Sequence, residues 1–180
     1  VTALELARYG VPSVIVTSEL QVSQGSRAIV FTRRSMEILQ QVGVDKQMTQ
    51  HGLPWRFGNS YYRNQHVFRM EAPHDPDDRF FPMLNIQQQY MEEYLLNACN
   101  EQKDGFAKVE IDTPEGPYVL ETEWLIAADG GRSGIRSAMN LEMEGSSYEG
   151  FFVIADIKID LPLPTERLAY FDPEWNPGNT

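Results

Sequence analysis

Apolar residues recur at intervals of three and four in three segments of the chain, which is the spacing of an amphipathic helix. Gly10 and Gly43 follow the first two segments, where a C-terminal cap belongs. The third segment begins at Gln88 and ends near Asn100. The apolar positions are Ala3, Leu6 and Ala7 in the first segment, Met36, Leu39 and Val42 in the second, and Met91, Leu95 and Ala98 in the third. The pattern predicts three helices. Cys99 lies on the third, on the same face as its apolar positions, and is expected to pack in the core.

Short apolar or aromatic runs between these helices predict strands. The first is 14–16, and an aromatic-rich stretch over 55–70 predicts two strands around the polar turn Arg63-Asn64-Gln65. Two further strands, 107–113 and 118–121, are expected to be joined by a turn at Pro114-Glu115-Gly116-Pro117. Helices and strands that alternate in this way indicate an α/β chain.

A glycine-rich turn follows the apolar run Trp124-Leu125-Ile126-Ala127-Ala128, which predicts a buried strand. Ser133 is placed to cap a short helix that carries Arg136. Backbone donors of such a turn suit a phosphate or a sugar, and Asp129 adds an acceptor for hydroxyls. Arg132 and Arg136 can pair with phosphate oxygens. The same pattern is also compatible with a tight turn between a strand and a helix.

Composition narrows the class of protein. The 180 residues are 42% hydrophobic, enough for a core, and the net charge is −11. That charge argues against nucleic acid or anionic lipid as a partner. No apolar run approaches the roughly 20 residues that span a membrane. One cysteine allows no intrachain disulfide, which fits a cytoplasmic protein.

The turn resembles a motif of the flavin-dependent aromatic hydroxylases, single-component FAD monooxygenases built like p-hydroxybenzoate hydroxylase. In that family a strand ending in Asp-Gly, followed by Ser and Arg, lies near the FAD and NAD(P)H sites. Asp129, Gly130, Ser133 and Arg136 match this motif position by position.

Two further segments carry the resemblance, in the family's order. Ser26-Arg27-Ala28, with the arginines and helix that follow, is similar to the family's first arginine segment, and the resemblance places Arg27 against the FAD pyrophosphate. The segment 88–95 is similar to the family's Gln-x-x-x-Glu-x-x-Leu helix, which places Gln88 near the ribityl and pyrophosphate region of the flavin. The subgroup that hydroxylates 3-(3-hydroxyphenyl)propionate or resorcinol fits best.

The resemblance implies an α/β fold, in which a Rossmann-like FAD-binding domain (FAD/NAD(P)-binding, GR2-type) carries an inserted β-rich substrate domain. Residues 1–52 and 84–150 are expected to be parts of the FAD-binding domain. Residues 53–83 and 151–180 are expected to be strands of the substrate domain. Both domains are expected to be incomplete, because the family's Gly-x-Gly-x-x-Gly motif and its later Gly-Asp motif are absent from these residues.

The implied activity is hydroxylation of a phenolic ring with FAD, NAD(P)H and O2, through a flavin C4a-hydroperoxide. The implied partners are a small aromatic substrate and O2, with no nucleic acid and no membrane, and a homodimer is left open. No metal site is indicated. The catalytic residue is not identified; location alone makes Tyr61, Tyr62 and His66 candidates for the base.

Two alternatives remain open at this point. Thr17 stands where the family has an acid for the adenosine ribose, which favours a non-catalytic fragment or pseudoenzyme without flavin. A different FAD- or NAD(P)-dependent oxidoreductase, such as an epoxidase, is the other.

Several residues also have a structural interpretation. Asn85 and Gln88 together approach a capping box, so that Gln88 closes the start of a helix. Arg27 is alternatively a solvated loop arginine, and Arg33 and Arg34 are expected to be exposed charges.

Overall fold

The computed structural model describes residues 1–17, 19, 21–24, 29–101, 106–110, 121–155 and 157–179, with the backbone alone for 106–110. The chain divides into two compact units. The first consists of Val1–Ile111 and Asp156–Thr180, and the second of Asp112–Ala155. Each unit is described by itself. The described helices include none that is long and apolar enough to cross a membrane.

Four helices belong to the first unit: α1 (Thr2–Arg8), α2 (Arg33–Gln41), α3 (Asp45–His51) and α4 (Gln88–Glu101). The three helices predicted from apolar spacing, α1, α2 and α4, are confirmed. Gly10 (φ +70°) and Gly43 (φ +81°) have left-handed backbone conformations directly after α1 and α2. A residue with a Cβ adopts this conformation only at a cost, so both glycines are suited to ending their helices.

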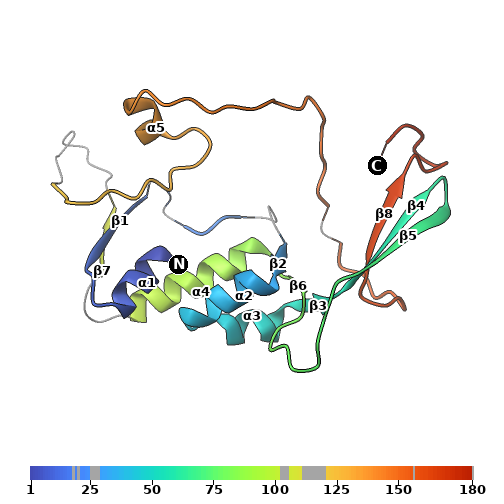
Figure 1. Ribbon diagram of the computed structural model, residues 1–180, viewed down its shortest axis with the longest axis horizontal. Coiled ribbons are helices and arrows are strands. Elements are labelled where there is room, and N and C mark those ends of the chain that lie inside the picture. Colours follow the sequence, from blue (N-terminus) through green and yellow to red (C-terminus); the bar gives the residue numbers. More distant parts are fainter. Residues whose placement is uncertain are drawn as a thin grey trace. The chain divides into compact units, whose positions relative to one another are not determined.

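The described strands of the first unit form three small sheets (Figure 1). β1 (Ser13–Thr17) pairs in parallel with β7 (Phe106–Glu110). β6 (Met83–Asn85) lies between β2 (Val30–Thr32) and β3 (Leu53–Trp55), antiparallel to both. In the third sheet, β4 (Phe57–Tyr62) is antiparallel to β5 (Gln65–Glu71) and parallel to β8 (Arg167–Phe171). Helices and parallel and antiparallel strands confirm the α/β class.

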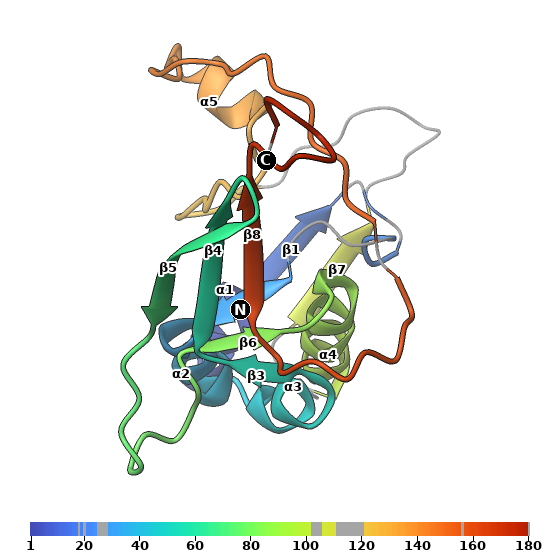
Figure 2. The same ribbon diagram turned by 90° about the vertical axis from the view of Figure 1, so that its right-hand side faces the viewer.

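The hairpin between β4 and β5 forms where the sequence predicts it, as Figure 2 shows. Arg63 (φ 45°) and Asn64 (φ 66°) both have positive φ, as the two central residues of a type I′ turn do. The predicted strand at 14–16 and the start of the one at 107–113 are also confirmed, as β1 and β7. Residues 111–120 lie outside the described residues. They include the rest of the strand predicted at 107–113, the predicted turn at 114–117 and most of the strand predicted at 118–121.

The core of the first unit lies among α2, α3 and β6. Its buried side chains come from these elements and from the adjoining loops, and one face of α4 packs against them. The cluster consists of Met36, Leu39, Val44, Met48, Phe80, Leu84 and Ile86. Cys99 on α4 is half-buried, and this burial raises the pKa of its thiol. A thiol of raised pKa is less often the nucleophilic thiolate, in keeping with a packing role.

Arg33 is not the exposed charge that the sequence predicts. Its guanidinium donates to the carbonyl oxygens of Phe80 (3.0 Å) and Pro73 (2.9 Å) and forms an ion pair with Asp78 (2.8 Å). The loop before β6 supplies these acceptors, which sequence spacing could not indicate. Arg34 is exposed as expected and pairs with Glu37.

The second unit contains α5 (Gly134–Ala138), the short helix expected after the glycine-rich turn. The strand predicted at 124–128 is wrong: these residues form no strand, and Trp124 is 86% exposed. A strand requires a neighbour to satisfy its backbone groups. In the described part of this unit no strand is available to pair with it. Residues 153–155, within the range expected to form substrate-domain strands, are likewise exposed and pair with no strand in the described part of the chain, whereas β8 forms.

Candidate functional site

Asp129 and Ser133 hold the glycine-rich turn together. The Ser133 hydroxyl donates to Asp129 Oδ1 (2.6 Å) and accepts from the backbone N–H of Arg136 (3.0 Å). Asp129 Oδ2 accepts from the N–H of Ile135 (3.2 Å). Ser133 therefore caps α5 as the sequence predicts, and Asp129 braces the cap from the preceding turn.

The electrostatics of the turn follow from these contacts. The Ser133 hydroxyl, followed by the N–H of Ile135, lowers the pKa of Asp129 because both donors favour the charged carboxylate. The carboxylate has about four acceptor positions, so accepting these two bonds leaves room for a ligand hydroxyl. Gly130 supplies the sharp bend with φ +77°, and its carbonyl accepts from the Ser133 N–H (3.1 Å).

Arg136 has a donor without a partner beside this turn, among the described residues. Its Nη1 donates to the carbonyl of Gly131 (3.0 Å), which fixes the guanidinium next to the glycines. Its Nε is buried, and the described residues provide no hydrogen-bond partner for it. A buried N–H without a partner is costly, so an anionic or carbonyl oxygen is the chemistry that this position would accept.

Gln88 lies at the beginning of α4, and its Nε2 donates to Glu92 Oε1 one turn later (2.6 Å). The capping box predicted from Asn85 and Gln88 is wrong, because Gln88 is the first residue of α4 and Asn85 lies in β6, where its Oδ1 accepts from the indole N–H of Trp55 (2.7 Å). The indole N–H of Trp55 can only donate, and the Asn85 oxygen is its acceptor in place of a backbone N–H of α4.

The structure brings Asp129, Gly130, Ser133 and Arg136 into one turn, all within the second unit. Gln88 belongs to the first unit, so its placement relative to that turn is not described. Arg27 lies outside the described residues. The cofactor-binding roles of all six residues stay predictions.

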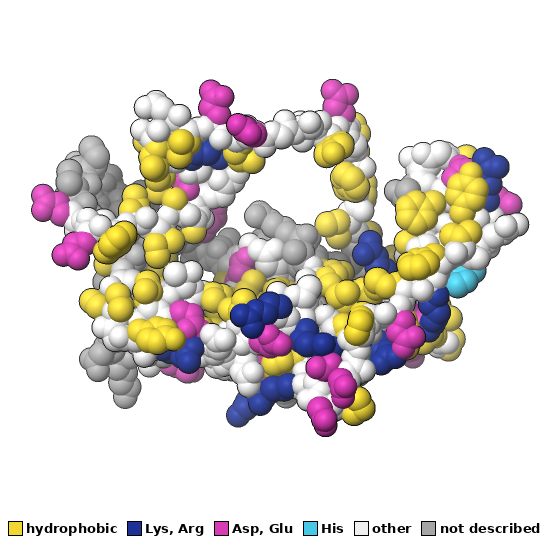
Figure 3. All heavy atoms as spheres, in the orientation of Figure 1, with side chains coloured by type: hydrophobic (Ala, Val, Ile, Leu, Met, Phe, Trp, Pro, Cys, Tyr) yellow, Lys and Arg dark blue, Asp and Glu magenta, His cyan; other side chains and the backbone are white. Residues whose placement is uncertain are grey.

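The sheet β5-β4-β8 carries aromatic and polar residues on one face. The rings of Tyr61 and Tyr170 stack with centroids 4.9 Å apart, and His66 meets Tyr61 edge-on at 5.2 Å. These pairs follow from the register, which places Tyr61 opposite both residues. Figure 3 shows hydrophobic side chains gathered over these strands, with a histidine at the margin of the sheet.

A polar network continues along the same face. Asn59 is buried, accepts from Arg69 (3.0 Å) and His66 (3.1 Å), and donates to Glu166 (2.6 Å). Arg69 and Glu166 are also an ion pair (2.8 Å), and Arg69, then Asn59, lowers the pKa of Glu166. Sequence analysis missed this network, because Asn59 and Glu166 are 107 residues apart and share no motif.

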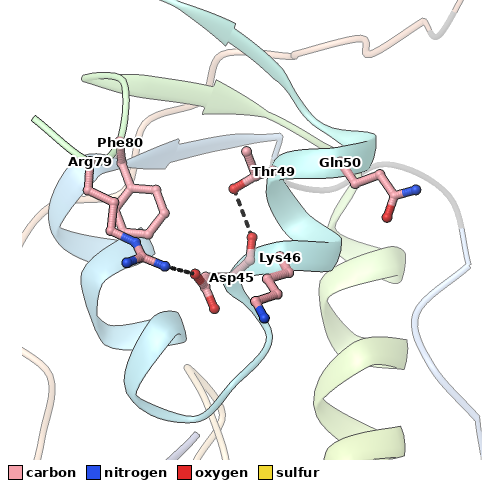
Figure 4. Close-up of a pocket in the computed structure, with 6 residues that line it drawn as sticks. All are labelled: Asp45, Lys46, Thr49, Gln50, Arg79 and Phe80. Carbon is pink, nitrogen blue, oxygen red and sulfur yellow. Dashed lines mark hydrogen bonds and ion pairs between the residues drawn. The ribbon is translucent and has the colours of Figure 1, made fainter. Parts of the chain in front are cut away.

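A separate hollow of about 420 Å³ lies beside α3 (Figure 4). Six residues line it: Asp45, Lys46, Thr49, Gln50, Arg79 and Phe80. The charges of Arg79 and Asp45 are paired with each other (3.2 Å), and Thr49 donates to the Asp45 carbonyl (2.8 Å). None of the residues predicted to bind cofactor lies in it.

Comparison with known protein families shows to which family the chain belongs. The sequence pattern of the FAD binding domain family matches residues 1–113. The chain belongs to this family. The matched range contains Arg27 and Gln88, whereas the Asp129 turn lies beyond it.

Relatives of this FAD binding domain chain include monooxygenases. It is 24% identical over 199 residues to a para-nitrophenol 4-monooxygenase of Pseudomonas sp. (strain WBC-3), covering 97% of this chain and 48% of the relative. It is 26% identical over 181 residues to a 3-(3-hydroxy-phenyl)propionate/3-hydroxycinnamic acid hydroxylase of Escherichia coli O81 (strain ED1a), covering 91% and 32%. The chain therefore spans half or less of the length of these relatives.

Solved structures of flavin-dependent monooxygenases share the fold. The flavin-dependent monooxygenase PieE, crystallised with FAD and substrate, superposes with a TM-score of 0.66 at 23% identity, over 80% of this chain and 30% of PieE. PqsL of Pseudomonas aeruginosa, a probable FAD-dependent monooxygenase, gives a TM-score of 0.63 at 14% identity, over 81% and 43%. The FAD-binding fold predicted from the sequence is thus confirmed.

Proposed function

We propose that this chain is part of a flavoprotein monooxygenase that hydroxylates a phenolic substrate with FAD, NAD(P)H and O2. The observation that carries the proposal is the family match over residues 1–113. The names of the relatives support it, since they include enzymes for nitrophenol and hydroxyphenylpropionate. The chain is further proposed to be cytoplasmic and to act without nucleic acid or a membrane. A homodimer is the proposed assembly.

The residues of the Asp129 turn fit FAD by their chemistry. The buried Nε of Arg136 lacks an acceptor among the described residues, and FAD offers pyrophosphate, ribityl and carbonyl oxygens. Asp129, kept ionised by its lowered pKa, is an acceptor for hydroxyl groups at neutral pH. In this proposal Arg136 donates to an oxygen of the cofactor, while Ser133 keeps the turn in shape.

Gln88 and Arg27 belong to the first unit and are also proposed to contact FAD. The Gln88 side chain stands at the first turn of α4, and the dipole of a helix favours an oxygen-rich ligand at this end. Arg27 is proposed to pair with the pyrophosphate, which needs a fixed positive charge. NAD(P)H is proposed to dock near the Asp129 turn, following the role of this motif in the resembled family.

FAD, when bound, supplies the redox chemistry, and the protein supplies binding, orientation and exclusion of water. The face of β4 and β8 that carries Tyr61 and Tyr170 is proposed to orient the aromatic substrate. A phenol becomes more electron-rich as its proton leaves, so an acceptor beside its hydroxyl accelerates the reaction. His66, which bonds Asn59 and contacts Tyr61, is the best-connected candidate for that acceptor.

The domain proposal follows the same division as the sequence expectation. Residues 1–52 and 84–150 are assigned to FAD binding, and 53–83 with 151–180 to the substrate domain. Pairing of β4 and β5 with β8, from the far end of the sequence, supports the second assignment.

Replacement of Arg27 tests the cofactor site. In the full-length protein, Arg27→Ala should weaken FAD binding by about 1.5–3 kcal/mol, the contribution of one hydrogen bond to a charged group. The dissociation constant is measured by quenching of flavin fluorescence. Arg34→Ala is the matched control, since Arg34 is exposed and pairs only locally with Glu37 among the described residues. Equal FAD affinity in the two variants would remove Arg27 from the site.

A further inference from the structure

Donors from two distant parts of the chain converge on the carboxylate of Glu92 in α4. The backbone N–H of Ser23 donates to Oε2 (2.7 Å), and the Ser23 hydroxyl donates to Oε1 (3.0 Å). The side-chain amide of Gln88 donates to the same Oε1 (2.6 Å). Ser23 is 69 residues away in sequence, so Glu92 joins a loop to a helix.

The chemistry of this contact requires a carboxylate. The three groups named above are donors, and an ionised carboxylate is an acceptor at both oxygens. A glutamine in its place would present an NH2 group to at least one of these donors. Hydrogen bonds to a charged acceptor are also stronger than those to a neutral one.

Glu92 joins Ser23, in the described stretch 21–24, to Gln88 at the start of α4. Gln88 is itself a proposed FAD contact, and its bond to Glu92 fixes the direction in which its amide points. A free side-chain amide would lose rotamer entropy on binding a ligand, whereas a fixed one has lost it already.

We propose that Glu92 is a positioning residue for FAD, whose carboxylate holds Ser23 and orients the amide of Gln88. This inference rests on the proposed function and assigns to Glu92 a role of its own. Glu92 touches no cofactor in this account and acts through Gln88.

Anchoring is tested without reference to FAD. Hydrogen–deuterium exchange is measured on the full-length protein for the peptide containing residues 21–24. Glu92→Gln should speed exchange at Ser23 about tenfold or more, since its N–H loses a charged acceptor. Glu93→Gln is the control, because it removes the same charge from the neighbouring, exposed position of α4. Equal exchange in the two variants would overturn the anchoring.

Coupling to the cofactor is tested by a double-mutant cycle of Glu92→Gln and Gln88→Ala, read as FAD dissociation constants. Each single variant should bind FAD about tenfold more weakly, the equivalent of one charge-assisted hydrogen bond. The double variant should be little weaker than either one, because in this proposal Glu92 acts on FAD only through Gln88. Additive losses would leave Glu92 with a merely structural role and overturn the proposal.

The outcomes separate this inference from the proposed function. A wild-type protein that takes up no FAD contradicts both. Wild-type binding that Glu92→Gln leaves unchanged contradicts the positioning role alone.

Discussion

The carboxylate of Asp129 shows how one residue serves two needs. Its two oxygens accept from Ser133 and Ile135 and so brace the start of α5. The same bonds lower its pKa, and the ionised carboxylate can also accept from a ligand hydroxyl. Structural and cofactor-binding interpretations of the motif are therefore compatible, since the acceptor positions suffice for both.

The stability of this turn should depend on pH through Asp129. The pKa of Asp129 in the folded protein lies below its ordinary value. The stabilisation of the turn by the ionised carboxylate is therefore complete above the ordinary pKa of about 3.9 and is lost as pH falls through the folded pKa. Protection of the Ile135 amide should thus be constant from neutral pH to about 4.5 and disappear only at lower pH. Amide exchange by NMR measures it.

Asp129→Ala provides the comparison at neutral pH. The variant has no side-chain oxygen, so Ile135 and Ser133 both lose this acceptor and protection of the Ile135 amide should fall without acid. An unchanged Ile135 amide in this variant would mean that the carboxylate does not brace the helix.

Asn59 is the residue on which the polar network of the β5-β4-β8 sheet depends. Asn59→Ala removes the acceptor of Arg69 and His66 and the donor to Glu166, all at a buried position. The free energy of unfolding should fall by about 1–3 kcal/mol, the summed net contribution of these three hydrogen bonds. Denaturant unfolding measures the loss. Gln65→Ala, exposed at the end of β5, is the control and should change little; equal effects would contradict the assigned role of Asn59.

At the scale of elements, the end of α3 is packed tightly against β6. A Cβ added to Gly52 would lie 2.7 Å from the carbonyl oxygen of Met48 and 2.7 Å from Leu84 Cγ. Backbone cannot yield as a flexible side chain does, so Gly52→Ala should lower the free energy of unfolding by about 1–3 kcal/mol.

Gln47→Ala is the matched variant in α3, because Gln47 is exposed and alanine is a good helix former. Thermal unfolding of both variants is compared with wild type. A Gly52 variant as stable as the Gln47 variant would show that α3 and β6 can separate slightly at little cost.

Sequence patterns predicted the longer elements well and the shortest ones poorly. α2 and α4 have apolar stripes over at least two turns, and the β4–β5 hairpin has an evident polar turn. α3 was missed because its seven residues contain a single buried apolar side chain, Met48. β2, β3 and β6 have three residues each, too few for an alternating pattern to be recognised.

The site was predictable only where it is local in sequence. Ser133 capping α5 follows from residue types three positions apart. The bonds from Ser23 to Glu92 and from Asn59 to Glu166 join residues 69 and 107 positions apart, and only the fold brings them together. The strand expected at 124–128 failed for the opposite reason, because apolar character cannot supply a pairing strand.

For the whole molecule, membership of the FAD binding domain family makes cofactor binding the central claim. The chain spans 48% of the length of the nitrophenol monooxygenase that it resembles, so the proposed catalysis is tested on the full-length protein.

The most direct measurement is an absorbance spectrum of the purified full-length protein after incubation with FAD and removal of the free cofactor. The account predicts bound flavin, with absorbance near ~450 nm and about one FAD per chain, as expected for the group that performs the redox chemistry. Addition of a phenol should then accelerate NAD(P)H oxidation. A colourless protein after this treatment would contradict the account at its foundation, since every role assigned to Arg27, Gln88 and the Asp129 turn depends on FAD.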